Sequence, residues 1–184
     1  MKLYTRTGDQ GQTRLIGNQV VMKDDPCVEA YGTIDEVNSY MGLVIASPDL
    51  SQALRDDLLL IQQYLFDCGT DIANQDQKIP YRTKEDWVLW LERKIDGYET
   101  IPPKLESFIL PGGCQAAAHL QYARALVRRA ERQIVTYMRQ HPVNSHVLKF
   151  LNRLSDYLFV AARLANFETG ISEPVYVRSG KVFR

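Results

Sequence analysis

The sequence lacks the features that mark membrane proteins and disulfide-rich secreted proteins. It contains no run of about 18 apolar residues, so no membrane-spanning helix is expected. Its first residues lack the apolar core of a signal peptide. The three cysteines, Cys27, Cys68 and Cys114, are odd in number and widely spaced, which is typical of free thiols in a reducing compartment. We therefore expect a cytoplasmic protein.

Charge bias and histidine-based motifs are also missing. The formal net charge is zero, which argues against a general nucleic-acid-binding protein. None of the three histidines follows a glutamate by three positions, as a di-iron helical bundle requires. No His-Glu-x-x-His or Gly-x-Ser-x-Gly motif occurs. The remaining polar residues are arginines, lysines, threonines and carboxylates, a set that suits a triphosphate, where positioning and charge stabilisation dominate.

Apolar periodicity predicts five helices with short connections and no convincing strand. We expect them at residues 26–47, 52–74, 83–97, 115–140 and 145–169. Thr83, with Asp86 three residues on, resembles a capping arrangement, and Gly97 would close that helix. Asn144 or Ser145 would cap the last one. The predicted fold is an all-α five-helix bundle in a single domain, 1–184, with an extended N-terminal segment (1–25), the bundle (26–170) and a C-terminal tail (171–184).

The fourth predicted helix carries an unusual arginine cluster, RALVRRAER at residues 124–132. On a helix Arg124, Arg128 and Glu131 share one face, with Arg132 at its edge. Like charges four residues apart cost a few tenths of a kcal/mol, so an anion that binds there would offset the repulsion. Guanidinium groups hold phosphate and carboxylate oxygens in pairs. The alternative is a solvated basic face without a ligand.

The N-terminal segment combines glycines with hydroxyls and cations. Glycine lets backbone N–H groups approach a ligand closely, and the neighbouring side chains could complete a cradle for phosphate oxygens. The candidates are Gly8, Gly11, Gly17, Thr5, Thr7, Thr13, Arg6, Arg14 and Lys23. No Gly-Lys-Ser/Thr follows the glycines, so this is not a Walker loop. A flexible N-terminal arm is an equally good interpretation.

Three further positions leave alternatives open. Asp35 lies at the margin of an apolar stripe, where it would be partly desolvated and paired with an arginine of this chain or of another copy; otherwise it is an exposed helix residue. Phe108, in the apolar run before Pro111-Gly-Gly, would pack in the core or line a pocket for a large apolar ligand. Asn152 would be a buried polar group, the interpretation favoured by its apolar helix, or a ligand contact.

Several segments together resemble the PduO-type ATP:cob(I)alamin adenosyltransferases, essentially from end to end. Each segment alone is modest evidence, but all of them in the family's order are highly specific. The matching segments are YTRTGDQGQTRLIG at 4–17, KDD at 23–25, EAYGTIDEVN at 29–38, LFDCG at 65–69, FILPGG at 108–113, ARALVRRAER at 123–132 and LNRLSD at 151–156.

The resemblance implies a homotrimer with active sites at the subunit interfaces. ATP with Mg²⁺ carried on its phosphates, and not by protein ligands, would be held by Thr5, Arg6, Thr7, Gly8, Thr13, Arg14, Lys23, Arg128, Arg129, Glu131, Arg132 and Asn152. Asp35 and Arg124 resemble the family's salt bridge across the interface. Phe108 resembles the aromatic residue that lies beneath the corrin of cobalamin, and Phe183 would close the same pocket. Arg6 departs from the family, whose members often carry lysine there.

The implied reaction transfers the 5′-deoxyadenosyl group of ATP to the cobalt of cob(I)alamin and releases tripolyphosphate. The nucleophile belongs to the corrin, so no protein general base is needed. A reductase and an adenosylcobalamin-dependent enzyme would be functional partners, with no nucleic acid and no membrane involved. Two rival hypotheses use the same arginines: a nucleotide-sensing bundle without activity, and a helical module that binds RNA or protein.

Overall fold

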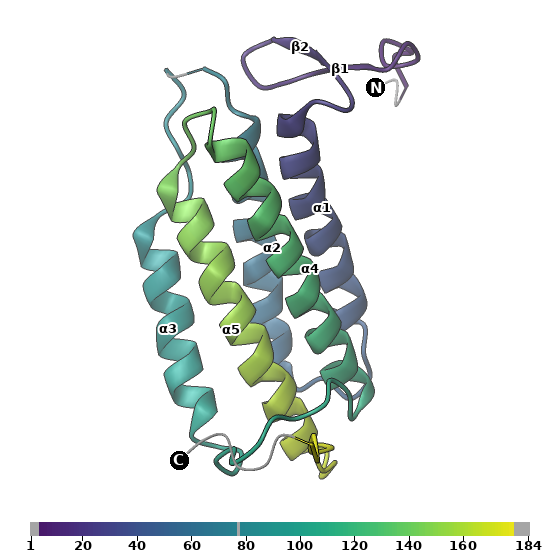
Figure 1. Ribbon diagram of the computed structural model, residues 1–184, viewed down its shortest axis with the longest axis vertical. Coiled ribbons are helices and arrows are strands. Elements are labelled where there is room, and N and C mark those ends of the chain that lie inside the picture. Colours follow the sequence, from purple (N-terminus) through teal and green to yellow (C-terminus); the bar gives the residue numbers. More distant parts are fainter. Residues whose placement is uncertain (1–3, 77, 179–184) are drawn as a thin grey trace.

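The protein is a bundle of long helices with a small hairpin at one end (Figure 1). The computed structural model describes residues 4–76 and 78–178. Its helices are α1 (Pro26–Ile45), α2 (Gln52–Ala73), α3 (Glu85–Glu99), α4 (Gln115–Met138) and α5 (Ser145–Glu168). Helix α1 packs on α2 and α4, α4 packs on α5, and α5 also carries α3. The predicted all-α five-helix bundle is confirmed.

Local signals set most helix ends. Asp25 precedes Pro26 at the start of α1, and its carboxylate accepts a hydrogen bond from the N–H of Cys27 at 2.8 Å. Asn144 caps α5 as predicted, because its Oδ1 accepts from the N–H of His146 at 3.1 Å. Gly170, with φ +69°, follows the end of α5 in the left-handed conformation that favours glycine.

The predicted ends of the third helix are wrong. Helix α3 begins at Glu85, and Lys84 at its N-cap makes no side-chain capping bond. Thr83 is instead buried, and its N–H donates to Asp71 Oδ2 at 2.9 Å. The buried carboxylate of Asp71 therefore takes Thr83 out of the capping role. Gly97 lies inside α3 and does not close it.

A β-hairpin precedes α1 and was not predicted. Strands β1 (Gln12–Arg14) and β2 (Val20–Met22) pair antiparallel with Thr13 opposite Val21. Three residues are too few for the alternation that identifies a strand in a sequence. Leu15 beside the hairpin is buried in the core, and the N–H of Gln75 donates to Ile16 O. A flexible arm is therefore the wrong interpretation of the hairpin, which is docked on the end of α2.

A buried carboxylate joins three helices in the interior. Asp57 of α2 accepts hydrogen bonds from Tyr98 of α3 at 2.7 Å and from Tyr157 of α5 at 3.1 Å. Lys94 of α3 lies 2.7 Å from the other oxygen. Burial raises the pKa of Tyr157 well above its usual value, so its hydroxyl stays protonated and donates. This cluster fixes α3 against α5.

We predict that Asn144→Ala lowers the free energy of unfolding by about 2–3 kcal/mol, because it removes a cap and leaves buried partners without a donor. The Asn144 amide also donates to Asp71 Oδ2 and to Thr83 O. Urea unfolding measures the change. Ser51→Ala is the matched control, because Ser51 holds the N-cap of α2 but makes no capping bond. An equal loss in both variants would contradict the prediction.

Candidate active site

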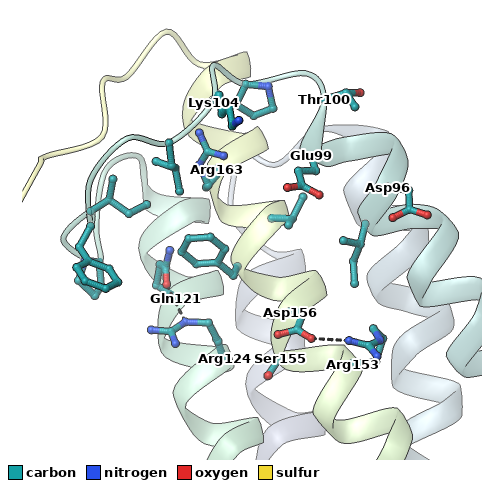
Figure 2. A pocket seen from close by; sticks show the side chains of 18 of the residues that line it. Asp96, Glu99, Thr100, Lys104, Gln121, Arg124, Arg153, Ser155, Asp156 and Arg163 are labelled. Atoms are coloured by element: carbon teal, nitrogen blue, oxygen red, sulfur yellow. Dashed lines mark hydrogen bonds and ion pairs between the residues drawn. The ribbon is translucent and has the colours of Figure 1, made fainter. Parts of the chain in front are cut away.

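A large cavity opens between α3, α4, α5 and the α3–α4 connection, residues 100–114 (Figure 2). Its volume is about 1560 Å³, above the roughly 300–1,000 Å³ of ordinary small-molecule pockets. Apolar, cationic and acidic side chains line it. Phe108, Ile109 and Phe159 are apolar, Arg124, Arg128 and Arg163 are cationic, and Glu92, Asp96, Glu99 and Asp156 are acidic. Such a space suits a large, partly apolar ligand, with an anionic part beside Arg124 and Arg128.

The connection between α3 and α4 supplies the aromatic wall of this cavity. Phe108 and Ile109 both line it, which confirms that this run lines a pocket. Phe108 is 50% exposed, so the alternative of core packing is wrong for this ring. Covering an exposed phenylalanine removes apolar surface from water, which is favourable. The segment therefore presents an apolar surface to the cavity.

Helix α4 supplies the cationic wall through what we call the arginine face, Arg124, Arg128 and Arg132. Arg124 and Arg128 line the same cavity as Phe108. Within residues 4–76 and 78–178 no carboxylate forms an ion pair with these three arginines. Burial, with the charge of Arg128 added, lowers the pKa of Arg124. An anion placed between the two side chains would relieve both effects.

Arg124 is held in a defined direction. It is half-buried, and its Nε donates to Gln121 Oε1 at 2.9 Å one turn earlier on α4. Figure 2 shows Gln121 above Arg124 on the same helix. A guanidinium fixed at Nε leaves its two terminal nitrogens for a partner.

The cavity residues that were not recognised as site residues from the sequence include Gln121, Arg153, Asp156 and Arg163. Arg153 donates to Glu92 Oε1 at 3.0 Å and to Asp156 Oδ2 at 2.8 Å, so it joins α3 to α5 at the cavity wall. Arg163 interrupts the most apolar part of α5 and is only 6% exposed. A single arginine inside an apolar run was the signal that could have identified it.

Asp35 differs from the preferred expectation. Its side chain is exposed on α1, and the described part of the chain offers it no ion pair. The adjacent Glu36 is exposed and forms an ion pair with Arg129. A desolvated ion pair of Asp35 with an arginine of the same chain is therefore wrong. The alternative with an arginine of another copy stays a prediction.

Asn152 also differs from its favoured interpretation. It is exposed rather than buried, and its amide donates to Glu131 Oε1 on α4 at 2.9 Å. The interpretation as a buried polar group is wrong, because this face of α5 looks outward next to the arginine helix. Asn152 and Glu131 therefore form a polar pair beside Arg128 and Arg132, which are both exposed.

The N-terminal candidates are gathered apart from the cavity. In Figure 1 the hairpin lies at one end of the bundle, and the α3–α4 connection lies at the other. A β-carbon built on Gly8 would lie 3.3 Å from Lys23 Nζ, so the glycine turn and this lysine are adjacent. Arg6 has φ +62°, and Thr5 and Thr7 share a 2.8 Å hydrogen bond. Thr13 and Arg14 belong to β1, whereas Phe183 lies outside the described residues.

Two features are absent from the described residues. No group of three or more His, Cys, Asp or Glu side chains among them is arranged to hold a metal ion. None of the helices in this part of the chain is long and apolar enough to cross a membrane. The fold and the cavity define a helical-bundle protein with a large cavity beside an arginine-rich helix.

Comparison with known proteins identifies the family. The family model described as cobalamin adenosyltransferase matches residues 3–165. The corrinoid adenosyltransferase of Bacillus subtilis is 48% identical over 187 residues, covering 100% of this chain and 96% of the relative. The human corrinoid adenosyltransferase MMAB is 37% identical, covering 97% of this chain and 74% of the relative. The chain belongs to the cobalamin adenosyltransferase family.

Solved structures agree in fold. A phenylalanine-to-histidine variant of the PduO-type ATP:corrinoid adenosyltransferase from Lactobacillus reuteri, complexed with cobalamin and ATP, superimposes with a TM-score of 0.94 at 47% identity. The match covers 99% of this chain and 100% of that one. An arginine-to-lysine variant of the same enzyme, complexed with ATP, has a TM-score of 0.90 at 46% identity, with 95% of this chain and 99% of that one covered. The resemblance seen in the sequence is confirmed.

Proposed function

We propose that this protein is an ATP:corrinoid adenosyltransferase that uses the cavity between α3, α4 and α5 for the corrin. It transfers the 5′-deoxyadenosyl group of ATP to the cobalt of cob(I)alamin and produces adenosylcobalamin and tripolyphosphate. The single observation that carries the proposal is that one cavity is lined by Phe108 and by two residues of the arginine face, Arg124 and Arg128.

The cavity fits a corrin in size and chemistry. Its volume of about 1560 Å³ accommodates a macrocycle with amide side chains, whereas ordinary ligands need roughly 300–1,000 Å³. Phe108 offers a flat apolar ring with no atom that binds cobalt. Placed beneath the corrin, this ring keeps a lower axial ligand away from the metal. Four-coordinate Co(II) is easier to reduce, so Phe108 favours formation of the Co(I) nucleophile.

The arginines meet the needs of the triphosphate. Reduced cobalt attacks C5′ of ATP, the cobalt–carbon bond forms with the electron pair of Co(I), and the C5′–O bond breaks. The tripolyphosphate leaves with the electrons of that bond. Arg128, Arg129 and Arg132 would hold its oxygens and stabilise their charge, together with Mg²⁺ carried on the phosphates. Glu131 and Asn152, paired at 2.9 Å, would orient the nucleotide.

We further propose that each active site is shared between copies of a homotrimer. Thr5, Arg6, Thr7, Gly8, Thr13, Arg14 and Lys23 would bind ATP from one subunit against the arginine face of the next. The distance between the hairpin and the cavity within one chain supports this arrangement (Figure 1). The outer faces of α1 and α4 expose the large apolar side chains Leu43, Tyr122, Val135 and Met138, as an interface between subunits requires.

Asp35 and Arg124 would then meet across the interface. Each has half of what a buried ion pair needs: Asp35 is exposed without a partner in the described part of the chain, and Arg124 is half-buried without a carboxylate. In this scheme residues 1–25 bind nucleotide, 26–170 form the bundle and 171–184 form the C-terminal tail, whose Phe183 would close the corrin pocket. The three free cysteines support a cytoplasmic location.

The proposed function is tested by mixing the protein with ATP, Mg²⁺ and chemically reduced cobalamin. The cobalt–carbon product is followed by absorbance, and tripolyphosphate is measured separately. Formation of both in equal amounts is expected. A nucleotide-sensing protein would bind ATP without producing either one, and that result would overturn the proposal. The physiological reductase and the enzyme that receives adenosylcobalamin are proposed partners outside this assay.

For Arg128→Ala we expect kcat/KM to fall roughly 10- to 150-fold, because a hydrogen bond to a charged group contributes about 1.5–3 kcal/mol. Steady-state kinetics with varied ATP measures the change. Arg139→Ala is the matched control, since Arg139 is exposed at the C-terminal end of the same helix, away from the cavity. Near-normal adenosylation by the Arg128 variant would refute its role.

For Phe108→Ala we expect ATP binding to survive while the spectroscopic signature of four-coordinate Co(II) fades. The smaller side chain admits water or another ligand to the lower face of the corrin. Electron paramagnetic resonance of the protein with ATP and cob(II)alamin measures the signature. Phe66→Ala, which removes an exposed ring from α2, serves as the control. A persistent signature in the Phe108 variant would count against the proposed aromatic wall.

For Asp35→Asn we expect a smaller oligomer or weaker cobalamin binding, because breaking an ion pair that is fully buried costs about 3–5 kcal/mol. Light scattering and a cobalamin titration measure the two outcomes. Asp86→Asn is the control, because it changes an exposed aspartate on α3, across the bundle from α1 (Figure 1). Unchanged mass together with unchanged affinity would eliminate the proposed pair.

A further inference from the structure

Arg163 is a buried arginine whose bonds connect three parts of the chain. It projects from α5 toward the α3–α4 connection (Figure 2). Its Nε donates to Glu173 Oε2 at 3.1 Å, and its Nη2 donates to Pro103 O at 2.6 Å. The side chains of Arg163 and Glu173 are 7% and 17% exposed. This largely buried pair, which we call the latch, therefore joins α5, the C-terminal tail and the start of the connection.

The tail beyond Glu173 pairs with the backbone that carries Phe108. The N–H of Tyr176 donates to Phe108 O at 2.7 Å, and the N–H of Leu110 donates to Pro174 O at 2.8 Å. Ile109 and Val175 form an antiparallel bridge between these bonds. The position of the Phe108 backbone thus depends on the position of a tail that the latch holds at Glu173.

The far end of the same connection is fixed by another residue of α5. Asn166, one turn after Arg163, accepts from the N–H of Cys114 at 2.9 Å and donates to Gly112 O at 3.1 Å. A β-carbon on Gly113 would overlap the Asn166 side chain, so this backbone passes directly over α5. The connection is held on α5 at both ends, and between them the backbone at Phe108 pairs with the tail.

We propose that Arg163 and Glu173 are positioning residues for adenosyl transfer. They hold the C-terminal tail, and the tail in turn sets the position of the Phe108 ring in the cavity proposed for the corrin. The inference rests on the proposed function, in which that ring lies beneath the corrin. Neither residue needs to touch the reacting atoms. Their effect on the cobalt passes through the hydrogen bonds between Tyr176 and Phe108 and between Leu110 and Pro174.

The chemistry of the pair explains why arginine and glutamate are needed. The planar guanidinium donates in two directions at once, to a carboxylate and to a carbonyl, which a lysine ammonium does not reproduce. Glu173 Oε1 is buried without a hydrogen-bond partner in the described part of the chain. Arg163 balances the charge of this carboxylate. Loss of either partner leaves the other charge buried and unpaired, and the tail is then no longer held on α5.

The test compares Glu173→Ala with Glu173→Gln, which keeps the volume and an acceptor but loses the charge. For Glu173→Ala we expect kcat to fall about 10- to 100-fold, because a displacement of roughly 1 Å in a residue that positions the substrate has an effect of this size. The KM for ATP should be unchanged. The four-coordinate Co(II) signature should fade as in Phe108→Ala. The glutamine variant should show a smaller loss of both. Should the alanine variant not fold, the glutamine variant carries the same test.

Coupling to Phe108 separates positioning from general loss of stability. In the Phe108→Ala/Glu173→Ala double variant we expect no further loss of the Co(II) signature beyond Phe108→Ala, because both changes act on one ring. Losses that multiply would overturn the proposal, as would a normal signature in both Glu173 variants. Asp67→Asn is the control, since it breaks an exposed ion pair with Arg82 at the opposite end of the bundle.

Hydrogen exchange gives a readout that needs no corrin. The amides of Leu110 and Tyr176 should exchange faster in Glu173→Ala, while the amide of Leu15, bonded to Gln19 O in the hairpin, should be unchanged. Unaltered exchange at Leu110 and Tyr176 would overturn the latch. If the wild-type protein forms no adenosylcobalamin, the proposed function fails, and the exchange data still report whether the latch holds the Phe108 segment.

Discussion

The packing of α5 against its neighbours decides where the proposed functional side chains lie. Helix α5 contacts α3 on one side and α4 on the other, and the cavity opens between these three helices. The hydrogen bonds from Tyr98 and Tyr157 to Asp57 fix α3 against α5. Arg163 and Asn166 hold the α3–α4 connection on α5. Apolar burial holds the bundle together, while these few buried polar groups give the cavity its shape.

This arrangement keeps the two groups of candidate site residues apart within one chain. Arg124, Arg128 and Phe108 share the cavity, whereas the hairpin of the N-terminal segment lies at the other end of the bundle. A reaction that needs nucleotide and corrin in contact therefore favours a site built from two copies. The exposed Asp35 and the half-buried Arg124, neither of them in an ion pair in the described residues, fit the same view.

Prediction from the sequence succeeded where a pattern was long or chemically simple. The five helices were located to within a few residues, because apolar spacing repeats over many turns and caps such as Asn144 act locally. It failed for the three-residue strands of the hairpin and for Thr83, whose N–H is bound by Asp71 from α2. The sequence also led to the wrong prediction that Asn152 is buried in the bundle. The pattern of a mostly apolar helix does not show which of its sides faces the solvent.

The sequence by itself determined the helical class and the family, and through the family the candidate residues Arg124, Arg128 and Phe108. These follow from local spacing and from the order of motifs, neither of which requires coordinates. Only the tertiary structure decided that Phe108, Arg124 and Arg128 border one cavity, and that Arg163 binds both the tail and the segment carrying Phe108. Such contacts join residues far apart in the chain, and their geometry is set by helix packing, which no local pattern specifies.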